Sequence, residues 1–268
     1  MPQLRVRPHA PDASGTVLEV TPQSAGWQHV GFKVVRLQAG QSYAGNEAQR
    51  ETCLVLVSGS ADIGVEEQLF TGLGGRATPF EDQAPGAVYV PAGQSYTVRA
   101  TTAVELAVCT APGSGAGHAR SIDAARMSRE TRGKDTNTRY VRNILPETEA
   151  AEGLLVVEVI TPGGHWSSYP PHKHDTATPE QETELEETYY HRLQPPQGFA
   201  IQRVYTDDRS LDETISVEDG DVVMVPRGYH PVGAPHGYDL YYLNVMAGPH
   251  RHWVFRNDPD HDWIVRKG

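Results

Sequence analysis

The sequence is poor in cysteine and has no long apolar run. Its two cysteines, Cys53 and Cys109, both lie in apolar, strand-like stretches. They cannot form the framework of a disulfide-rich secreted domain, and we expect two buried thiols in a reducing cytoplasm. No apolar run approaches the length of a transmembrane helix, and the first residues, MPQLR, lack the apolar core of a signal peptide. The sequence therefore predicts neither membrane insertion nor secretion.

Positive charge is also scarce. The chain has 23 Lys and Arg residues against 34 Asp and Glu residues, which gives a formal net charge of −11. An acidic protein is repelled by nucleic acid and by anionic membrane surfaces, so neither is an expected partner. Small metabolites remain as the expected partners.

Glycine and proline, by contrast, are abundant. The chain has 26 glycines and 20 prolines, and they separate short runs rich in Val, Tyr, Thr and Leu. This pattern is typical of many short strands joined by turns, so we predict an all-β fold. The run Gly86–Gly93 is similar to Gly220–Gly228, and Pro91 precedes Pro226 by 135 positions. The repeat predicts a duplicated β-barrel.

The second half carries residues that are typical metal ligands. His172 and His174 are two positions apart in SSYPPHKHD, so their side chains point to the same side of an extended segment. His230 follows the apolar run VVMV and the turn PRG, a pattern that predicts a buried strand and a tight turn. Three histidines and one carboxylate suit manganese, iron, zinc or nickel and leave coordination positions open. Open coordination positions are typical of a catalytic metal site rather than of a structural one.

Glu187 is the preferred carboxylate ligand, although other acidic residues compete with it. It begins the strand-like run ETYYH, whereas residues 175–184 are polar and have the composition of a loop. Glu186 would face the opposite side of the same strand, so only one of the two can point at a metal ion. The competing residues are Asp175, Glu180, Glu182, Glu184 and Glu186.

We divide the chain into a first barrel over residues 1–112, a linker over residues 113–145 and a second barrel over residues 146–268. The linker is basic, and we expect a short helical turn after Ser121. A solvated connector is the simpler role for its cations, but they could instead reach a substrate carboxylate. The basic residues are Arg129, Arg132, Lys134, Arg139 and Arg142.

The first barrel lacks the ligand pattern of the second. Glu51 lies on an apolar strand 136 positions before Glu187, but the positions that correspond to the histidine pair fall near residues 37–39, which include no histidine. We therefore expect the first barrel to bind no metal. Its expected role is to bury sheet surface against the second barrel or against another subunit, which would suit a homo-oligomer.

The ligand motifs resemble the paired motifs of the cupin superfamily, in which small antiparallel barrels bind a metal ion. That resemblance implies a bicupin with two jelly-roll-like barrels. The strings SSYPPHKHD, LEETYYHR, GFAIQRVYTDDRSLDE, DGDVVMVPRGYHPV and GYDLYYLNVMAGPHRHW resemble the 5-deoxy-glucuronate isomerase family of inositol catabolism over residues 130–265. This closer resemblance implies an aldose–ketose isomerase that converts 5-deoxy-D-glucuronate to 5-dehydro-2-deoxy-D-gluconate through a metal-stabilised enediolate.

Such a reaction needs a group that moves a proton. Tyr189 and His191 share a strand face with Glu187, and Tyr242 lies on the inward face of the last long strand. We predict Tyr189, His191 and Tyr242 as acid–base candidates. Packing in the core is the simpler role for any one of these side chains, and a metal-bound hydroxide is an alternative base.

A sugar-acid substrate also needs a cation for its carboxylate. Arg203 is the first candidate, because a guanidinium group can bind a carboxylate through two parallel hydrogen bonds, and Arg227 beside His230 is the second. For each arginine, a structural salt bridge is the alternative. Lys173 alternates away from the histidines on either side of it, so we expect no direct catalytic role for it.

Two other functions fit the same residues. Three histidines and one carboxylate also support iron and oxygen chemistry, so a metal-dependent cupin oxygenase is the main enzymatic alternative. The other alternative is a non-catalytic sugar-acid-binding cupin, in which the metal ion only docks the ligand. Oxygen uptake would favour the first alternative, and binding without turnover would favour the second.

Overall fold

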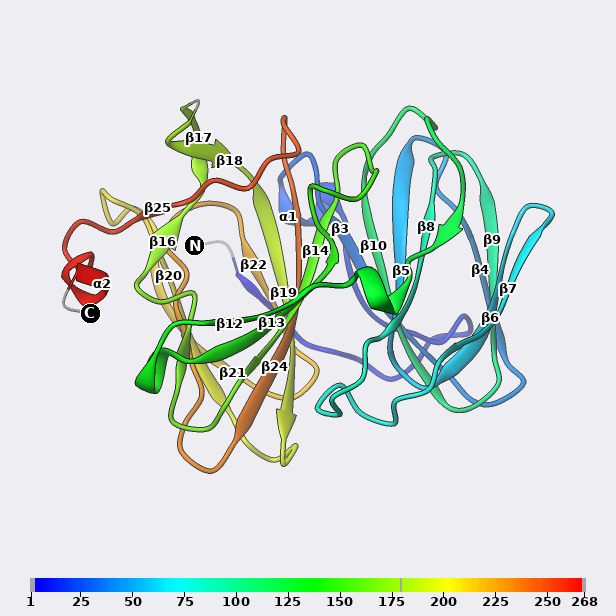
Figure 1. Cartoon of the computed structure of the whole chain (residues 1–268), viewed down its shortest axis with the longest axis horizontal. Helices are drawn as coiled ribbons and strands as arrows, with labels where there is room; N and C mark the ends of the chain where they lie inside the picture. The colour runs from blue at the N-terminus through cyan, green and yellow to red at the C-terminus, as the bar shows by residue number, and fades with distance from the viewer. Residues whose placement is uncertain (1–2, 179, 267–268) are drawn as a thin grey trace. The chain divides into compact units, whose positions relative to one another are not determined.

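The computed structural model describes residues 3–178 and 180–266, and strands dominate it (Figure 1). The helical elements are single turns: α1 (Pro22–Ala25), η1 (Ala124–Arg126), η2 (Asp135–Asn137) and α2 (Trp263–Arg266). The all-β prediction is therefore confirmed. The expected turn after Ser121 is η1, where the Asp123 side chain accepts a hydrogen bond from the Ala125 backbone N–H. None of the helices in the described residues has the length and apolar character needed to cross a membrane.

The described residues form two compact units. The amino-terminal unit contains residues 8–128 and 142–157, and the carboxy-terminal unit contains residues 3–7, 129–141 and 158–266. This division differs from the expected barrel boundaries. Residues 3–7 and 129–141 belong to the carboxy-terminal unit, whereas residues 146–157, which we expected in the second barrel, belong to the amino-terminal unit.

The amino-terminal unit contains a six-stranded and a four-stranded sheet. In sheet order, the six strands are β11 (Arg120–Ser121), β8 (Gly86–Val90), β5 (Arg50–Ser58), β10 (Val104–Pro112), β3 (Gly31–Leu37) and β2 (Thr16–Val20). The four are β4 (Ser42–Asn46), β9 (Ser95–Ala100), β6 (Ser60–Val65) and β7 (Gln68–Gly74). Buried and exposed residues alternate along β9, as expected for a strand with one solvated face.

An apolar cluster fills the space between these two sheets. Leu54 and Leu56 of β5 belong to it together with Ile63 of β6 and Val98 of β9, and all four side chains are fully buried. The facing sheets thus bury aliphatic side chains, which is the usual core of a β-sandwich.

The remaining strands are arranged in four sheets, and most of their residues belong to the carboxy-terminal unit. The seven-stranded sheet contains, in order, β1 (Arg5–Val6), β22 (Val222–Val225), β19 (Glu186–Gln194), β24 (Asp239–Ala247), β14 (Leu155–Thr161), β13 (Arg139–Leu145) and β12 (Arg129–Arg132). The four-stranded sheet contains β15 (Trp166–Ser167), β23 (Val232–Gly233), β20 (Ala200–Tyr205) and β21 (Asp212–Val217). Two small sheets pair β16 (His172–Lys173) with β25 (Arg256–Asn257) and β17 (Asp175–Thr178) with β18 (Glu182–Glu184). Figure 1 shows β17 and β18 projecting at one end of this unit.

The chain start joins the carboxy-terminal unit through β1. Arg5 pairs with Val223 in antiparallel register, and the Leu4 carbonyl accepts a hydrogen bond from the Met224 backbone N–H. The Arg5 guanidinium also lies 2.6 Å from the buried Asp221 carboxylate. Because β1 continues the hydrogen-bond ladder of β22, residues far apart in the sequence form one sheet.

Candidate metal centre and active site

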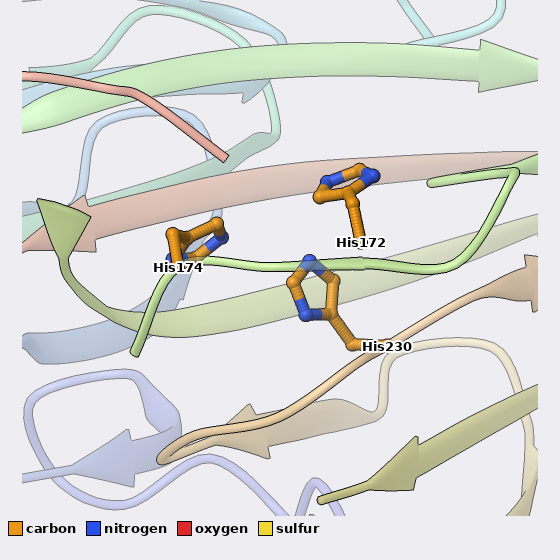
Figure 2. Close-up of side chains that lie close together, drawn as sticks. All are labelled: His172, His174 and His230. Carbon is orange, nitrogen blue, oxygen red and sulfur yellow. The ribbon is translucent and has the colours of Figure 1, made fainter. Parts of the chain in front are cut away.

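Three imidazole rings gather in the carboxy-terminal unit. His172 is on β16, His174 follows it, and His230 follows a single β-bridge between Tyr205 and Tyr229. One ring nitrogen from each histidine lies within 4.8 Å of the other two, and all three side chains are buried. Figure 2 shows the rings converging from the segment that carries His172 and His174 and from the segment that carries His230.

The turn before His230 depends on a glycine. Gly228 has a φ of +91°, and a Cβ atom at this position would lie 2.4 Å from the Tyr205 carbonyl oxygen. A residue with a side chain would therefore be both strained and blocked. The Gly228 carbonyl accepts a hydrogen bond from His230 Nδ1 at 2.9 Å, which leaves the Nε2 lone pair of His230 directed away from the turn.

Glu187 is the carboxylate that the structure brings to the three histidines. Its Oε1 lies 2.5 Å from His174 Nε2, and its Oε2 lies 3.5 Å from His230 Nε2. The Glu187 side chain is buried at the start of β19, where the neighbouring Glu186 faces the other side of the strand. Together, the three histidines and Glu187 form a cluster that we call the cage.

Two of the competing carboxylates have a different role beside the cage. Lys173 points away from the histidines, and its ammonium lies 2.7 Å from Asp175 and 3.6 Å from Glu182. Asp175 also accepts a hydrogen bond from the Gly228 backbone N–H at 2.8 Å. The Lys173–Asp175 pair therefore links the segment that carries His172 to the turn that precedes His230.

The electrostatics of the cage suit a divalent cation. Burial, together with His230 and His174, lowers the pKa of His172 well below its usual value, so this imidazole is neutral. Burial alone would raise the pKa of Glu187, but the nearby His174 and His230 outweigh it and keep the carboxylate ionised. Burial opposes protonation of His174, but Glu187 outweighs this effect and raises its pKa, so a metal ion would displace a proton there.

Several buried atoms of the cage lack hydrogen-bond partners. They are His174 Nδ1, Glu187 Oε2 and His230 Nε2, whereas His174 Nε2 faces Glu187 Oε1 at 2.5 Å. Unsatisfied buried polar atoms are costly, and a cation bound by nitrogen and oxygen donors would satisfy those that face the centre. The residues present therefore fit a divalent metal ion held by His172, His174, Glu187 and His230.

The predicted acid–base residues lie next to the cage. Tyr189 and Tyr242 have ring centroids 4.8 Å apart, and the Tyr189 ring centroid is 5.7 Å from that of His230. The Tyr189 hydroxyl contacts Ser168 Oγ at 3.0 Å, and the Tyr242 hydroxyl contacts Ser167 Oγ at 2.6 Å. Burial raises the pKa of both tyrosines, most strongly that of Tyr189, which also lies near Glu187. Both hydroxyls are therefore protonated at neutral pH.

His191 lies on the same face of β19, and its hydrogen bonds define its tautomer. The Gln202 amide nitrogen donates to the His230 carbonyl at 3.5 Å, so the Gln202 oxygen faces His191 and accepts from its Nε2 at 3.0 Å. His191 Nδ1 therefore carries a lone pair, and this buried atom has no hydrogen-bond partner. Burial lowers the pKa of His191 to about 4, so the ring is neutral at neutral pH.

Neither predicted arginine is brought to the cage. Arg203 alternates with the inward-facing Gln202 on β20, and it forms a two-pronged salt bridge with Asp212 in which both distances are 2.8 Å. About 41% of its side chain is exposed, so this pair is a surface salt bridge. Arg227 is also exposed and lies 3.5 Å from Ser210 Oγ.

A cavity of about 460 Å³ opens beside His172. Its lining combines cations, aromatic rings and apolar side chains, namely Lys134, Arg139, Tyr169, His172, Phe255 and Ile264. The Phe255 ring centroid lies 4.4 Å from that of His172, so the cavity reaches the cage. The sequence offered a signal for its cations, because Lys134 and Arg139 belong to the basic cluster of the predicted linker. Ser167, Ser168 and Gln202 carried no comparable signal.

Comparison with known proteins places this chain in a family. The model of the KduI/IolB family matches residues 4–264. The chain belongs to the KduI/IolB family. Among curated relatives, the 5-deoxy-glucuronate isomerase of Geobacillus thermodenitrificans is 52% identical over 265 residues, which cover 99% of this chain and 97% of the relative. That of Halalkalibacterium halodurans is 47% identical and covers 99% and 100% of the two chains.

One solved structure agrees with this membership of the KduI/IolB family, and another shares the fold. The crystal structure of an IolB-like protein from Salmonella typhimurium LT2 has a TM-score of 0.95 and 51% identity, and it covers 98% of this chain and 99% of its own. Bacillus subtilis oxalate decarboxylase OxdC has a TM-score of 0.67 at 14% identity, with 96% and 80% of the two chains covered. The second likeness concerns the fold alone, and it confirms the predicted bicupin architecture.

Proposed function

We propose that this member of the KduI/IolB family is a metal-dependent 5-deoxy-glucuronate isomerase. It converts the aldose 5-deoxy-D-glucuronate to the ketose 5-dehydro-2-deoxy-D-gluconate in myo-inositol catabolism. The observation that carries the proposal is the alignment, at 46–53% identity, with curated relatives of that name over at least 91% of this chain. The buried cage beside an open cavity supports the same reaction.

The isomerisation moves two hydrogen atoms and needs no redox partner. One hydrogen leaves C2 and returns to C1, while the hydroxyl hydrogen moves from O2 to O1. A manganese, zinc, iron or nickel ion held by His172, His174, Glu187 and His230 would supply a Lewis acid for the two oxygens.

The residues next to the cage can carry these hydrogens. The neutral His191 ring offers the Nδ1 lone pair as an acceptor for the C2 proton. Burial makes the protonated ring a better acid than a free imidazolium, so it would return the proton to C1. Tyr189 and Tyr242, whose hydroxyls are held by Ser168 and Ser167, can donate hydrogen bonds to the oxygens where negative charge develops.

Proton NMR under anaerobic conditions tests the proposal. Metal-loaded protein is incubated with 5-deoxy-D-glucuronate in deuterated water, and the aldehyde signal and the new C1 methylene are followed, with chelator-treated protein as the control. We expect loss of the aldehyde and deuterium at C1, because the transferred proton can exchange with solvent. Absence of conversion with a confirmed metal content would contradict the proposal. Oxygen uptake in an aerobic run would then indicate an oxygenase, and binding without turnover would indicate a sugar-acid-binding protein.

A further inference from the structure

Arg139 is a cation with an unusual position in the carboxy-terminal unit. It begins β13 and lines the cavity beside His172, and its side chain is only partly accessible. Arg139 Nη1 donates to the Asn137 carbonyl at 3.1 Å and to the Tyr169 carbonyl at 3.3 Å. These two bonds use one edge of the guanidinium group, whose other nitrogens carry further N–H donors.

Within the part of the chain that the structure describes, no carboxylate forms a salt bridge with Arg139. Arg203, which is more exposed, is fully paired with Asp212. Burial lowers the pKa of Arg139, and the nearby Arg132 acts in the same direction, whereas Tyr242 and Tyr189 oppose both. A partly buried cation without a counter-charge is costly, and an anion in the cavity would offset that cost.

A second cation lies at the same cavity. Lys134 lines it from the residue before η2, where its side chain is exposed and makes no capping hydrogen bond. The lining also includes the apolar side chains of Phe255 and Ile264. The cavity lining therefore combines two cations and apolar side chains with the cage ligand His172.

We propose that Arg139, with Lys134 beside it, binds the carboxylate of the sugar acid. The identity of that acid as 5-deoxy-D-glucuronate rests on the proposed function, but the binding of a carboxylate by these two cations does not. The reacting aldehyde end would then extend toward His172 and the cage. This arrangement replaces the expected roles of Arg203 and Arg227, whose side chains do not line the cavity.

Binding is measured with an analogue that cannot isomerise. Titration calorimetry uses the sugar acid whose aldehyde has been reduced to an alcohol, and a neutral analogue that carries a hydroxymethyl group in place of the carboxylate. R139Q is compared with the parent protein and with R203Q, which removes the same charge on the same unit. Metal content is measured for every protein, so that loss of the cage is separated from loss of the cation.

We expect R139Q to weaken binding of the acid on the order of 100-fold, since truncating one partner of a buried charge pair removes both attraction and hydrogen bonds. The neutral analogue should bind to R139Q and to the parent with the same affinity, and R203Q should bind both compounds like the parent. Acid binding to R139Q within threefold of the parent overturns the proposal. An equal loss of affinity for both compounds also overturns it, because it indicates a structural role.

Two further variants complete the test: R139K addresses misfolding of R139Q, and K134Q tests the second cation. If R139Q does not fold, R139K retains the charge but not the forked geometry, and it should bind the acid about tenfold more weakly while the neutral analogue is unaffected. K134Q should show a loss of a few fold for the acid alone, because its side chain is exposed. Equal effects on the two analogues in R139K would overturn the proposal.

The outcome also separates this inference from the proposed function. If the parent does not convert 5-deoxy-D-glucuronate but binds the reduced acid through Arg139, only the isomerase proposal fails. If the parent converts the substrate and R139Q has unchanged kinetic constants, only the carboxylate proposal fails. If both proposals hold, R139Q should mainly raise KM for the acid, since the carboxylate is bound equally in the ground state and the transition state.

Discussion

Strands β5 and β19 hold corresponding places in the two units, but their inward residues differ. In the first unit, Thr52 pairs with Val90 on the neighbouring strand, and in the second unit Glu187 pairs with Val225. Glu187 lies 135 positions after Thr52, and Val225 lies 135 positions after Val90. Beyond Thr52, Leu54 and Leu56 enter an apolar cluster. At the corresponding positions beyond Glu187, Tyr189 and His191 form the polar interior beside the cage. The same arrangement of strands therefore supports either a packed aliphatic core or a polar interior beside a metal centre.

The two buried glutamates sharpen this comparison. Glu51 is as deeply buried as Glu187, but its carboxylate accepts hydrogen bonds from the Tyr89 hydroxyl at 2.6 Å and from three backbone N–H groups. Those donors are the backbone N–H groups of Glu152, Gly153 and Leu154, at 2.7, 2.5 and 2.6 Å. Glu187 instead has an oxygen without a hydrogen-bond partner. A buried carboxylate whose oxygens are all satisfied anchors the chain, whereas one that remains unsatisfied can bind a ligand.

The largest expected effect comes from making the second unit like the first. Glu187→Thr installs the residue found at the corresponding position 52. We expect loss of the bound metal and a fall in kcat/KM of about 10³-fold or more, because a Lewis acid contributes several kcal/mol to the reaction barrier. Metal analysis and the NMR assay measure the two effects. The control is Thr52→Val, which should keep both metal and activity. Retention of a stoichiometric metal ion by Glu187→Thr would remove Glu187 from the cage.

The converse experiment disturbs the aliphatic core of the first unit. Leu54→Ala should lower the free energy of unfolding by about 2–5 kcal/mol, since it removes buried methyl groups and leaves a cavity. Metal content and kcat should not change at a temperature where the variant is folded. Leu69→Ala is the matched control, because 68% of Leu69 is exposed on β7, and it should change stability by less than about 0.5 kcal/mol. Denaturant unfolding provides the comparison. Loss of metal in Leu54→Ala would show that the first unit does more than pack.

Much of this contrast could be predicted from the sequence because it follows from local patterns. Alternation in an extended segment predicted a common side for His172 and His174, and the apolar run and turn predicted how His230 would be presented. The repeat of 135 positions predicted two similar barrels. The offset of 136 between Glu51 and Glu187, however, is one residue longer than the observed register. In a strand, a shift of one residue moves a side chain to the opposite face.

The arginines could not be assigned from the sequence, because their roles depend on tertiary contacts. Nothing local in the sequence distinguishes the inward face of β20 from its outward face. Only the fold shows that Gln202 faces His191 while Arg203 faces Asp212. Arg139 was grouped with a basic linker, yet the segment that contains it forms β12 and β13. A charged segment gains a binding role only when the fold brings it to a cavity, and sequence spacing does not carry that information.

The third prediction concerns pH and the polar interior that distinguishes the second unit. The pKa of His191 is lowered from 6.5 to about 4 by burial, so between these pH values the unfolded chain binds a proton that the folded chain does not. The resulting contribution to the free energy of unfolding is complete above pH 6.5 and is lost as the pH falls toward 4, with a total of about 3 kcal/mol.

Replacing His191 with Leu, the residue type at position 56, should remove this dependence on pH. The free energies of unfolding of the two proteins, measured with chelator present between pH 4 and 8, should therefore differ by an amount that changes with pH. The cage histidines are present in both proteins, so their own titration largely cancels in that difference. A constant difference across the range would mean that His191 is already protonated or already solvated in the folded protein, and it would remove this ring as the neutral acceptor of the C2 proton.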